Sequence, residues 1–206
     1  MQMEEPLNII ISGVGGQGNV IASHILASAA VKDGYYVSVG ETYGAAQRGG
    51  TVLSHVRLSK ERQYGPLTPK GRAQIILGLE PIECLRTFGS YGSEETRVIV
   101  NPRPVYPIDV LTEMSKYPEV EDVLAALKEV AYSLQVVEAT ELAKKIGDSI
   151  MLNIVMIGCL AGSDLTPIRK ETLEDVVRET FSMRKPEANL QAFLAGFEEI
   201  RKIIPS

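Results

Sequence analysis

Residues 7–18 read LNIIISGVGGQG, and this stretch decides the fold. Its first half is a continuous apolar run, which is typical of a parallel strand that is buried on both faces. A cluster of glycines follows directly, as expected where a strand turns sharply into a helix. The segment therefore predicts the opening strand of an open sheet and the loop at its carboxyl end.

Beyond the glycines the chain changes to a helical pattern. One side of the predicted helix carries Val20, Ile21, Ile25, Ser28 and Val31. Gly34 ends this helix, and residues 35–39 predict a second strand. A strand, a loop, a helix and a second strand in succession indicate an α/β fold with a parallel sheet.

The rest of the chain extends the same architecture. Further strands are predicted at 51–58 (exposed on one side), 73–79, 96–100 and 134–137. We expect a Rossmann-like, open, mostly parallel sheet with helices on both faces and a helical carboxyl-terminal tail. We assign residues 1–206 to a single domain, with a core at 7–148 and the tail at 149–206.

Composition excludes several classes of protein. The 206 residues carry a net charge of −5 and no block of Lys or Arg, which argues against a nucleic-acid surface. The longest apolar stretch, residues 150–162, is too short to span a bilayer, and the first six residues lack a basic signal-peptide region. With only two cysteines, the sequence predicts a soluble, cytoplasmic protein.

The glycine loop also matches the dinucleotide fingerprint. Gly13, Gly15 and Gly18 satisfy G-x-G-x-x-G, and Glu41 lies 23 residues further on, where an acid would receive a ribose. Two functional hypotheses follow: a stand-alone NAD(P)- or FAD-dependent oxidoreductase, or a non-catalytic nucleotide-binding module. In a third interpretation the glycines only permit close packing of strand and helix.

The segment after the second strand departs from a dinucleotide-binding pattern. Residues 41–50 read ETYGAAQRGG and lead to SHVR at 54–57, where such a domain would continue into a crossover helix. Together with GVGGQG at 13–18, these motifs resemble the gamma-type domain of pyruvate and ketoisovalerate ferredoxin oxidoreductases, and most closely its indolepyruvate branch. Tyr43 departs from that branch, which more often has histidine there. Weaker matches are LGLEP at 77–81, NP at 101–102 and NIVMIG at 153–158.

The resemblance implies a role in the oxidative decarboxylation of 2-oxoacids to acyl-CoA with reduction of ferredoxin. In this family thiamine diphosphate, Mg and iron–sulfur clusters carry the chemistry. Cys84 and Cys159 are too few for a tetrathiolate cluster, and the chain has no thiamine-diphosphate metal-site motif. We therefore expect the isolated chain to be inactive and to be capable of self-association. Its partner would be a large subunit that holds these cofactors and reaches ferredoxin, with coenzyme A as a further contact.

Loops that follow parallel strands gather at one edge of a sheet, which predicts where this chain would bind a cofactor or partner. Arg48 would face an anion there or form a structural salt bridge, while Gln47 and Asn101 would orient a ligand or satisfy buried backbone groups. No catalytic residue or metal site is predicted. We expect His24 to be packed in the first helix and His55 to lie on an exposed strand face. The predicted site residues are Gly13, Gly15, Gly16, Gln17, Gly18, Glu41, Tyr43, Gly44, Gln47, Arg48, Gly49, Gly50 and Asn101.

Overall fold

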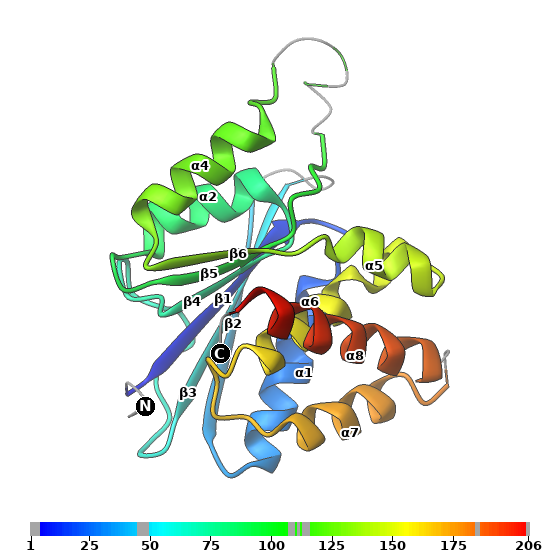
Figure 1. Cartoon of the computed structure of the whole chain (residues 1–206). Helices are drawn as coiled ribbons and strands as arrows, with labels where there is room; N and C mark the ends of the chain where they lie inside the picture. The colour runs from blue at the N-terminus through cyan, green and yellow to red at the C-terminus, as the bar shows by residue number, and fades with distance from the viewer. Residues whose placement is uncertain are drawn as a thin grey trace.

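A single six-stranded sheet organises the molecule (Figure 1). The computed structural model describes residues 5–44, 50–106, 110, 112, 116–183 and 186–204. The strands are β1 (Leu7–Val14), β2 (Tyr36–Tyr43), β3 (Thr51–Ser59), β4 (Ile75–Gly78), β5 (Arg97–Val100) and β6 (Ser133–Val136). The helices are α1 (Asn19–Lys32), α2 (Pro81–Tyr91), α4 (Val120–Val130), α5 (Ala139–Ile146), η1 (Ser149–Met151), α6 (Leu152–Gly162), α7 (Lys170–Thr180) and α8 (Pro186–Ile203).

The strand order is β2-β3-β1-β4-β5-β6, and it confirms the mostly parallel α/β fold. β1, β4, β5 and β6 pair in parallel, whereas β3 is antiparallel to both β1 and β2. β1 and β2 therefore run in the same direction without touching, because β3 lies between them. The predicted second strand was too short: β2 extends to Tyr43, so Glu41 lies within the strand.

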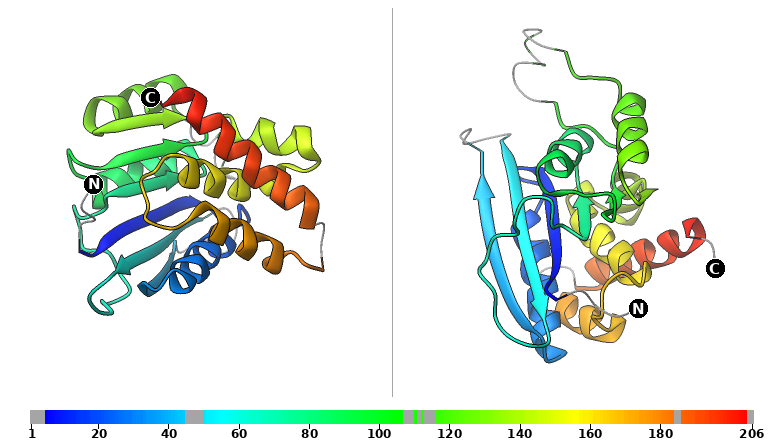
Figure 2. Two further views of the ribbon diagram at one scale, coloured as in Figure 1. Left: turned by 60° about the horizontal axis from the view of Figure 1, so that its bottom comes forward. Right: turned by 90° about the vertical axis from the view of Figure 1, so that its left-hand side faces the viewer.

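Helices cover both faces of the sheet, as predicted. α2 and α4 lie over one face, and α1 with α5, α6, α7 and α8 lies over the other (Figures 1 and 2). Each face has its own apolar core; the larger core combines β1, α1, α6 and α8, and the smaller includes Ile10, Cys84, Phe88 and Leu127. No helix in the described ranges is long and apolar enough to cross a membrane.

α1 turns a different side to the sheet from the one predicted. Ala22, Ala29 and Ala30 are fully buried, whereas Ile21 is 44% and Val31 60% exposed. Ile25 is buried as predicted, but Ile21 and Val31 are not. Small side chains occupy much of the interface because they allow the helix to approach the sheet closely. The prediction for His24 was wrong for the same reason, because this side chain lies on the exposed face.

The face of β2 and β3 opposite α1 is covered by residues 60–71. Arg57 in β3 donates from Nη1 to the carbonyl oxygen of Gly65 (2.8 Å), and Ser38 in β2 donates to that of Tyr64 (2.6 Å). β3 is consequently buried on both faces, and the predicted exposure of His55 was wrong. His55 is fully buried beside the ring of Tyr91, and neither ring nitrogen has a hydrogen-bond partner among the described residues.

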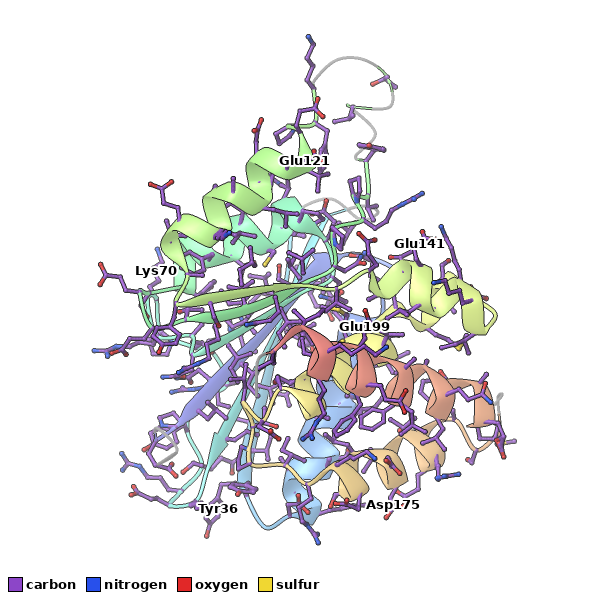
Figure 3. The ribbon with its side chains drawn as sticks, viewed as in Figure 1. Tyr36, Lys70, Glu121, Glu141, Asp175 and Glu199 are labelled. Atoms are coloured by element: carbon purple, nitrogen blue, oxygen red, sulfur yellow. The ribbon has the colours of Figure 1, made fainter. Side chains whose placement is uncertain are left out.

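The tail is helical and packs directly on the sheet layer. α6 and α8 cross in close contact, because Gly158 and Gly196 leave no side chain between them. A Cβ on Gly158 would lie 1.9 Å from the carbonyl oxygen of Phe193. Acidic side chains lie on the outer helices. Those labelled in Figure 3 on α4, α5, α7 and α8 lie far apart, so negative charge is distributed over the helical layers.

Candidate functional site

The turn between β1 and α1 requires its glycines. Gly16 has φ 101° and Gly18 has φ 84°, a backbone conformation that disfavours any side chain. Gly13 has an ordinary φ, but a Cβ there would lie 2.8 Å from Oε1 of Gln17. The local fold thus explains these three glycines before any ligand is considered.

The polar groups of Gln17 and Gly15 form hydrogen bonds that stabilise the fold. The amide of Val14 donates to Oε1 of Gln17 at 2.8 Å, and Nε2 of Gln17 donates to the carbonyl oxygen of Leu79 at 3.1 Å. The amide of Gly15 donates to the carbonyl oxygen of Gly50 at 3.0 Å. These bonds tie the glycine loop to β4 and to the start of β3, and they bring the two predicted loops together at the carboxyl edge.

The helical tail also supports the glycine loop, a contact that the sequence did not reveal. Asn153 in α6 is 4% exposed, and its Nδ2 donates to the carbonyl oxygen of Gly18 at 3.2 Å. A Cβ on Gly18 would lie 2.4 Å from that nitrogen. Gly18 is therefore fixed both by its φ angle and by close packing against α6.

Glu41 does not present a free carboxylate to the loop. Its two oxygens accept hydrogen bonds from Ser23 in α1 (2.9 Å) and Ser54 in β3 (2.6 Å). In the dinucleotide fingerprint the acid follows the strand next to β1, but here β3 occupies that neighbouring position. The structure therefore places Glu41 in a structural network that joins α1, β2 and β3.

A hollow of about 660 Å³ remains beside the glycine loop. It is lined by Gly15, Gly16, Gly18, Asn19, Val20, Ile21, Tyr43, Gly44, Gly50, Thr51 and Val52. Its polar end is the first turn of α1, which contains no acidic residue and receives no side-chain cap from the part of the chain that the structure describes. Such a helix end attracts negative charge, while the other walls are largely apolar. These lining residues include no carboxylate, imidazole or thiol, so the described hollow suits binding and offers no acid–base pair.

Gln47, Arg48 and Gly49 lie outside the described residues. The role assigned to Arg48, facing the glycine loop as an anion or partner contact, stays a prediction. Tyr43 and Gly50, which lie before and after Arg48 in the sequence, both line the hollow. Tyr43 is at the end of β2 and is 65% exposed, and Gly50 directly precedes β3.

Asn101 follows β5 at the same edge and is fully buried. Its Nδ2 donates to the carbonyl oxygen of Leu79 at 3.0 Å, and its Oδ1 accepts from the amide and hydroxyl of Thr140, both at 3.2 Å. Of the two roles left open for Asn101, the geometry matches the satisfaction of buried backbone groups.

A second cluster on this edge was missed by sequence reasoning. Glu80, 1% exposed, caps α2 by accepting from the amide of Glu83 at 2.8 Å, and it also accepts from the hydroxyl of Tyr117. Burial raises the pKa of Glu80, against the opposing effect of these donors. Glu83 accepts from Thr51 at 2.6 Å and pairs with Arg86. One sequence signal could have revealed this cluster. Glu80 stands as a helix cap directly before Pro81, and proline is favoured at the first helical position.

The thiols of Cys84 and Cys159 are free and fully buried. Burial raises the pKa of both, which keeps them protonated and unreactive. Within the described ranges, no group of three or more His, Cys, Asp or Glu residues could hold a metal ion.

The chain is similar to known proteins over most of its length. Residues 8–199 match the family described as pyruvate ferredoxin/flavodoxin oxidoreductase. The chain is 38% identical to indolepyruvate oxidoreductase subunit IorB of Archaeoglobus fulgidus, over 94% of each chain. It is 33% identical to the subunit of that name in Thermococcus kodakarensis, over 96% of this chain and 97% of the relative.

Solved structures show the same fold. The gamma subunit of a keto/oxoacid ferredoxin oxidoreductase from Geobacter sulfurreducens is 25% identical, with a TM-score of 0.68 over 94% of this chain and 98% of that one. A 2-oxoglutarate:ferredoxin oxidoreductase chain from Magnetococcus marinus is 20% identical, with a TM-score of 0.73. That match covers 97% of this chain but 32% of the other, so there the same fold forms one part of a longer chain.

Proposed function

The chain belongs to the pyruvate ferredoxin/flavodoxin oxidoreductase family, and from this we propose that it is the small subunit of an indolepyruvate-type 2-oxoacid:ferredoxin oxidoreductase. With its partner it would oxidatively decarboxylate arylpyruvates to acyl-CoA and reduce ferredoxin. The observation that carries this proposal is the similarity to indolepyruvate oxidoreductase subunits over nearly the full length of both chains.

The cofactors of the reaction belong, in this proposal, to a large partner subunit. An iron–sulfur cluster needs about four thiolates. Cys84 and Cys159 are two buried thiols on different helices, so their chemistry does not suit a cluster. Thiamine diphosphate and its Mg would likewise be held by the partner, which passes electrons to ferredoxin. The free thiols are consistent with a reducing cytoplasmic location.

The contribution of this chain would be to bind and position. We propose that the carboxyl edge, from the hollow at the glycine loop to Asn101, packs against the large subunit. The uncapped first turn of α1 suits a carboxylate of the partner or a phosphate of coenzyme A. Exposed Tyr43 and Ile21 flank this turn and supply apolar contact area.

A stand-alone dinucleotide enzyme is not favoured by the geometry. β3 separates β1 from β2, and the carboxylate of Glu41 is bound to Ser23 and Ser54. Neither feature fits the ribose contact on which that hypothesis depends.

Assembly tests the proposal directly. The tagged chain is co-expressed with the large indolepyruvate oxidoreductase subunit of the same organism, and the purified material is assayed for mass, iron and thiamine diphosphate. We expect one complex that contains both chains and both cofactors, whereas the chain purified alone contains neither. Separate elution of the two chains under all salt conditions would contradict the proposal.

A further inference from the structure

The connection between β5 and α4 is much longer than the connection between β4 and α2, the preceding strand and helix. It runs through residues 101–119, whereas Leu79 and Glu80 alone join β4 to α2 at the same edge. We call its described parts near the sheet, residues 101–106 and 116–119, the arm base.

Glu80 holds both limbs of the arm base. Its Oε1 accepts from the amide of Val105 in the outgoing limb (3.4 Å) and from the hydroxyl of Tyr117 in the returning limb. The rings of Tyr106 and Tyr117 meet edge to face, with centroids 5.2 Å apart and planes at 88°. One buried carboxylate thus closes the two limbs onto the start of α2.

The same contacts complete the amino end of α2. Glu80 accepts from the amide of Glu83 in the first turn of the helix while it holds the hydroxyl of Tyr117. The positive end of this helix favours the ionised form of Glu80, although burial disfavours it. The position of the arm base is therefore coupled to the first turn of a helix in the core.

Apolar surface nevertheless remains exposed on the closed arm base. Val105 is 36% and Tyr106 49% exposed, although both are held in place by their neighbours. Tyrosines that are exposed and rigid are enriched at the centres of protein interfaces, because they offer contact area at a low cost in conformational entropy.

The arm base is continuous with the hollow at the glycine loop. Thr51, which lines the hollow, donates to Glu83 in the first turn of α2 at 2.6 Å. Glu83 in turn donates its amide to Glu80, the residue that holds the arm. Exposed Ile21, Tyr43, Val105 and Tyr106 therefore belong to one side of the molecule, the carboxyl edge of the sheet.

We infer that Tyr106 and Val105 are a second contact point for the large subunit, and that Glu80 and Tyr117 are positioning residues that preset the arm base for it. The inference rests on the proposed function, since the occupant is the large subunit itself. The partner surface it requires is an apolar recess that admits one aromatic ring. Removal of the Tyr106 ring should weaken assembly. Loss of the hydrogen bond between Glu80 and Tyr117 should also weaken assembly, because the Tyr106 ring is then no longer held in position.

Affinity of the purified chain for the large subunit tests the contact. Tyr106→Ala should bind at least roughly tenfold more weakly, the usual range for an aromatic anchor. The matched control is Tyr132→Ala, which removes another exposed tyrosine (65%) at the opposite, amino end of β6; its affinity should equal that of wild type. Equal binding of wild type and Tyr106→Ala overturns this inference alone, whereas no binding by wild type overturns the proposed function with it.

A double-mutant cycle tests the positioning role. Tyr117→Phe keeps the ring and removes only the hydroxyl, so the chain should fold, exchange the Val105 amide hydrogen faster and bind the large subunit more weakly. In Tyr106→Ala the additional Tyr117→Phe change should cost nothing further, because its effect passes through the ring of Tyr106. Fully additive losses in affinity, or unchanged exchange at Val105, would contradict the assignment of Tyr117 as a positioning residue.

Discussion

The side-chain amide of Asn153 in α6 donates to the carbonyl oxygen of Gly18 at the start of α1, 3.2 Å away. This bond joins the helical tail to the glycine loop, two segments that lie far apart in the sequence. The tail is therefore part of the framework of the candidate site. Any change that moves α6 should also alter the hollow beside the loop.

We predict different costs for alanine at two glycines of this loop. Gly16→Ala and Gly18→Ala both force a side chain into a positive φ, which costs roughly 1–3 kcal/mol. Only Gly18→Ala also meets Asn153, since no atom of the described residues lies within 4 Å of a Cβ on Gly16. Urea unfolding should find Gly18→Ala less stable by a further ~1–3 kcal/mol. Adding Asn153→Ala should restore most of that difference; equal stability of the two glycine variants would refute the packing account.

The α6–α8 crossing should not tolerate a methyl group. Gly158→Ala places a Cβ against the carbonyl oxygen of Phe193, and backbone cannot give way as a side chain can. We expect a loss of about 3 kcal/mol or more in the free energy of unfolding. Gly89→Ala is the matched control, because Gly89 lies in α2 with nothing near its Cβ and should gain up to ~1 kcal/mol from helix propensity. A Gly158→Ala variant as stable as wild type would show that the helices are not in contact there.

His55 should make the protein less stable in acid. Burial, and then the charge of Arg57, lower the pKa of His55 below its ordinary value of about 6.5. Between the folded and unfolded pKa values the unfolded chain binds the extra proton, so stability present above about pH 6.5 is lost as the pH falls. The loss for one group is at most ~1.4 kcal/mol per pH unit.

Urea unfolding of wild type and His55→Phe across about pH 5–7.5 measures this difference. The phenyl ring preserves the contact with Tyr91 and carries no proton, so the variant should lose less stability on acidification. Identical slopes for wild type and His55→Phe would mean that His55 does not titrate with unfolding.

Arg48 carries a prediction that concerns assembly. If it forms an anion or partner contact beside the glycine loop, Arg48→Ala should leave the free energy of unfolding of the free chain nearly unchanged. Its affinity for the large subunit should fall about ten- to a hundredfold, the range for a charge-assisted hydrogen bond. Arg48→Lys keeps the positive charge but lacks the planar guanidinium group. Its affinity for the large subunit should lie between those of wild type and Arg48→Ala. Unfolding of the free chain without a selective effect on assembly would assign Arg48 to a structural role.

Much of the fold could be predicted because local patterns carry it. The buried run 7–12 and the glycines that follow specify a central strand and a tight turn into a helix, and β1 and α1 have that form. The order of strands was not predictable. β3 lies antiparallel between β1 and β2, and the spacing of apolar residues in β1 and β2 does not indicate which strand is their neighbour. His55 was misplaced because residues 60–71, a segment without regular apolar spacing, cover the second face of β3.

The candidate site was predicted only in part. The two glycine-containing loops meet at the carboxyl edge, as their positions after β1 and β2 indicate. Glu41 looked like a ligand residue because the sequence does not reveal its partners Ser23 and Ser54. The contact between Glu80 and Tyr117 was missed because it joins distant segments, and only the helix cap at Glu80 before Pro81 is marked in the sequence.

Reconstitution of activity tests the central claim most directly. The large subunit is held at a fixed concentration, this chain is added in increasing amounts, and indolepyruvate-dependent reduction of ferredoxin is followed in the presence of coenzyme A. We predict that the chain alone is inactive, and that the rate rises with added chain and saturates when the two are equimolar. A large subunit that is fully active alone and gains nothing from this chain would contradict the assignment as a subunit of the enzyme.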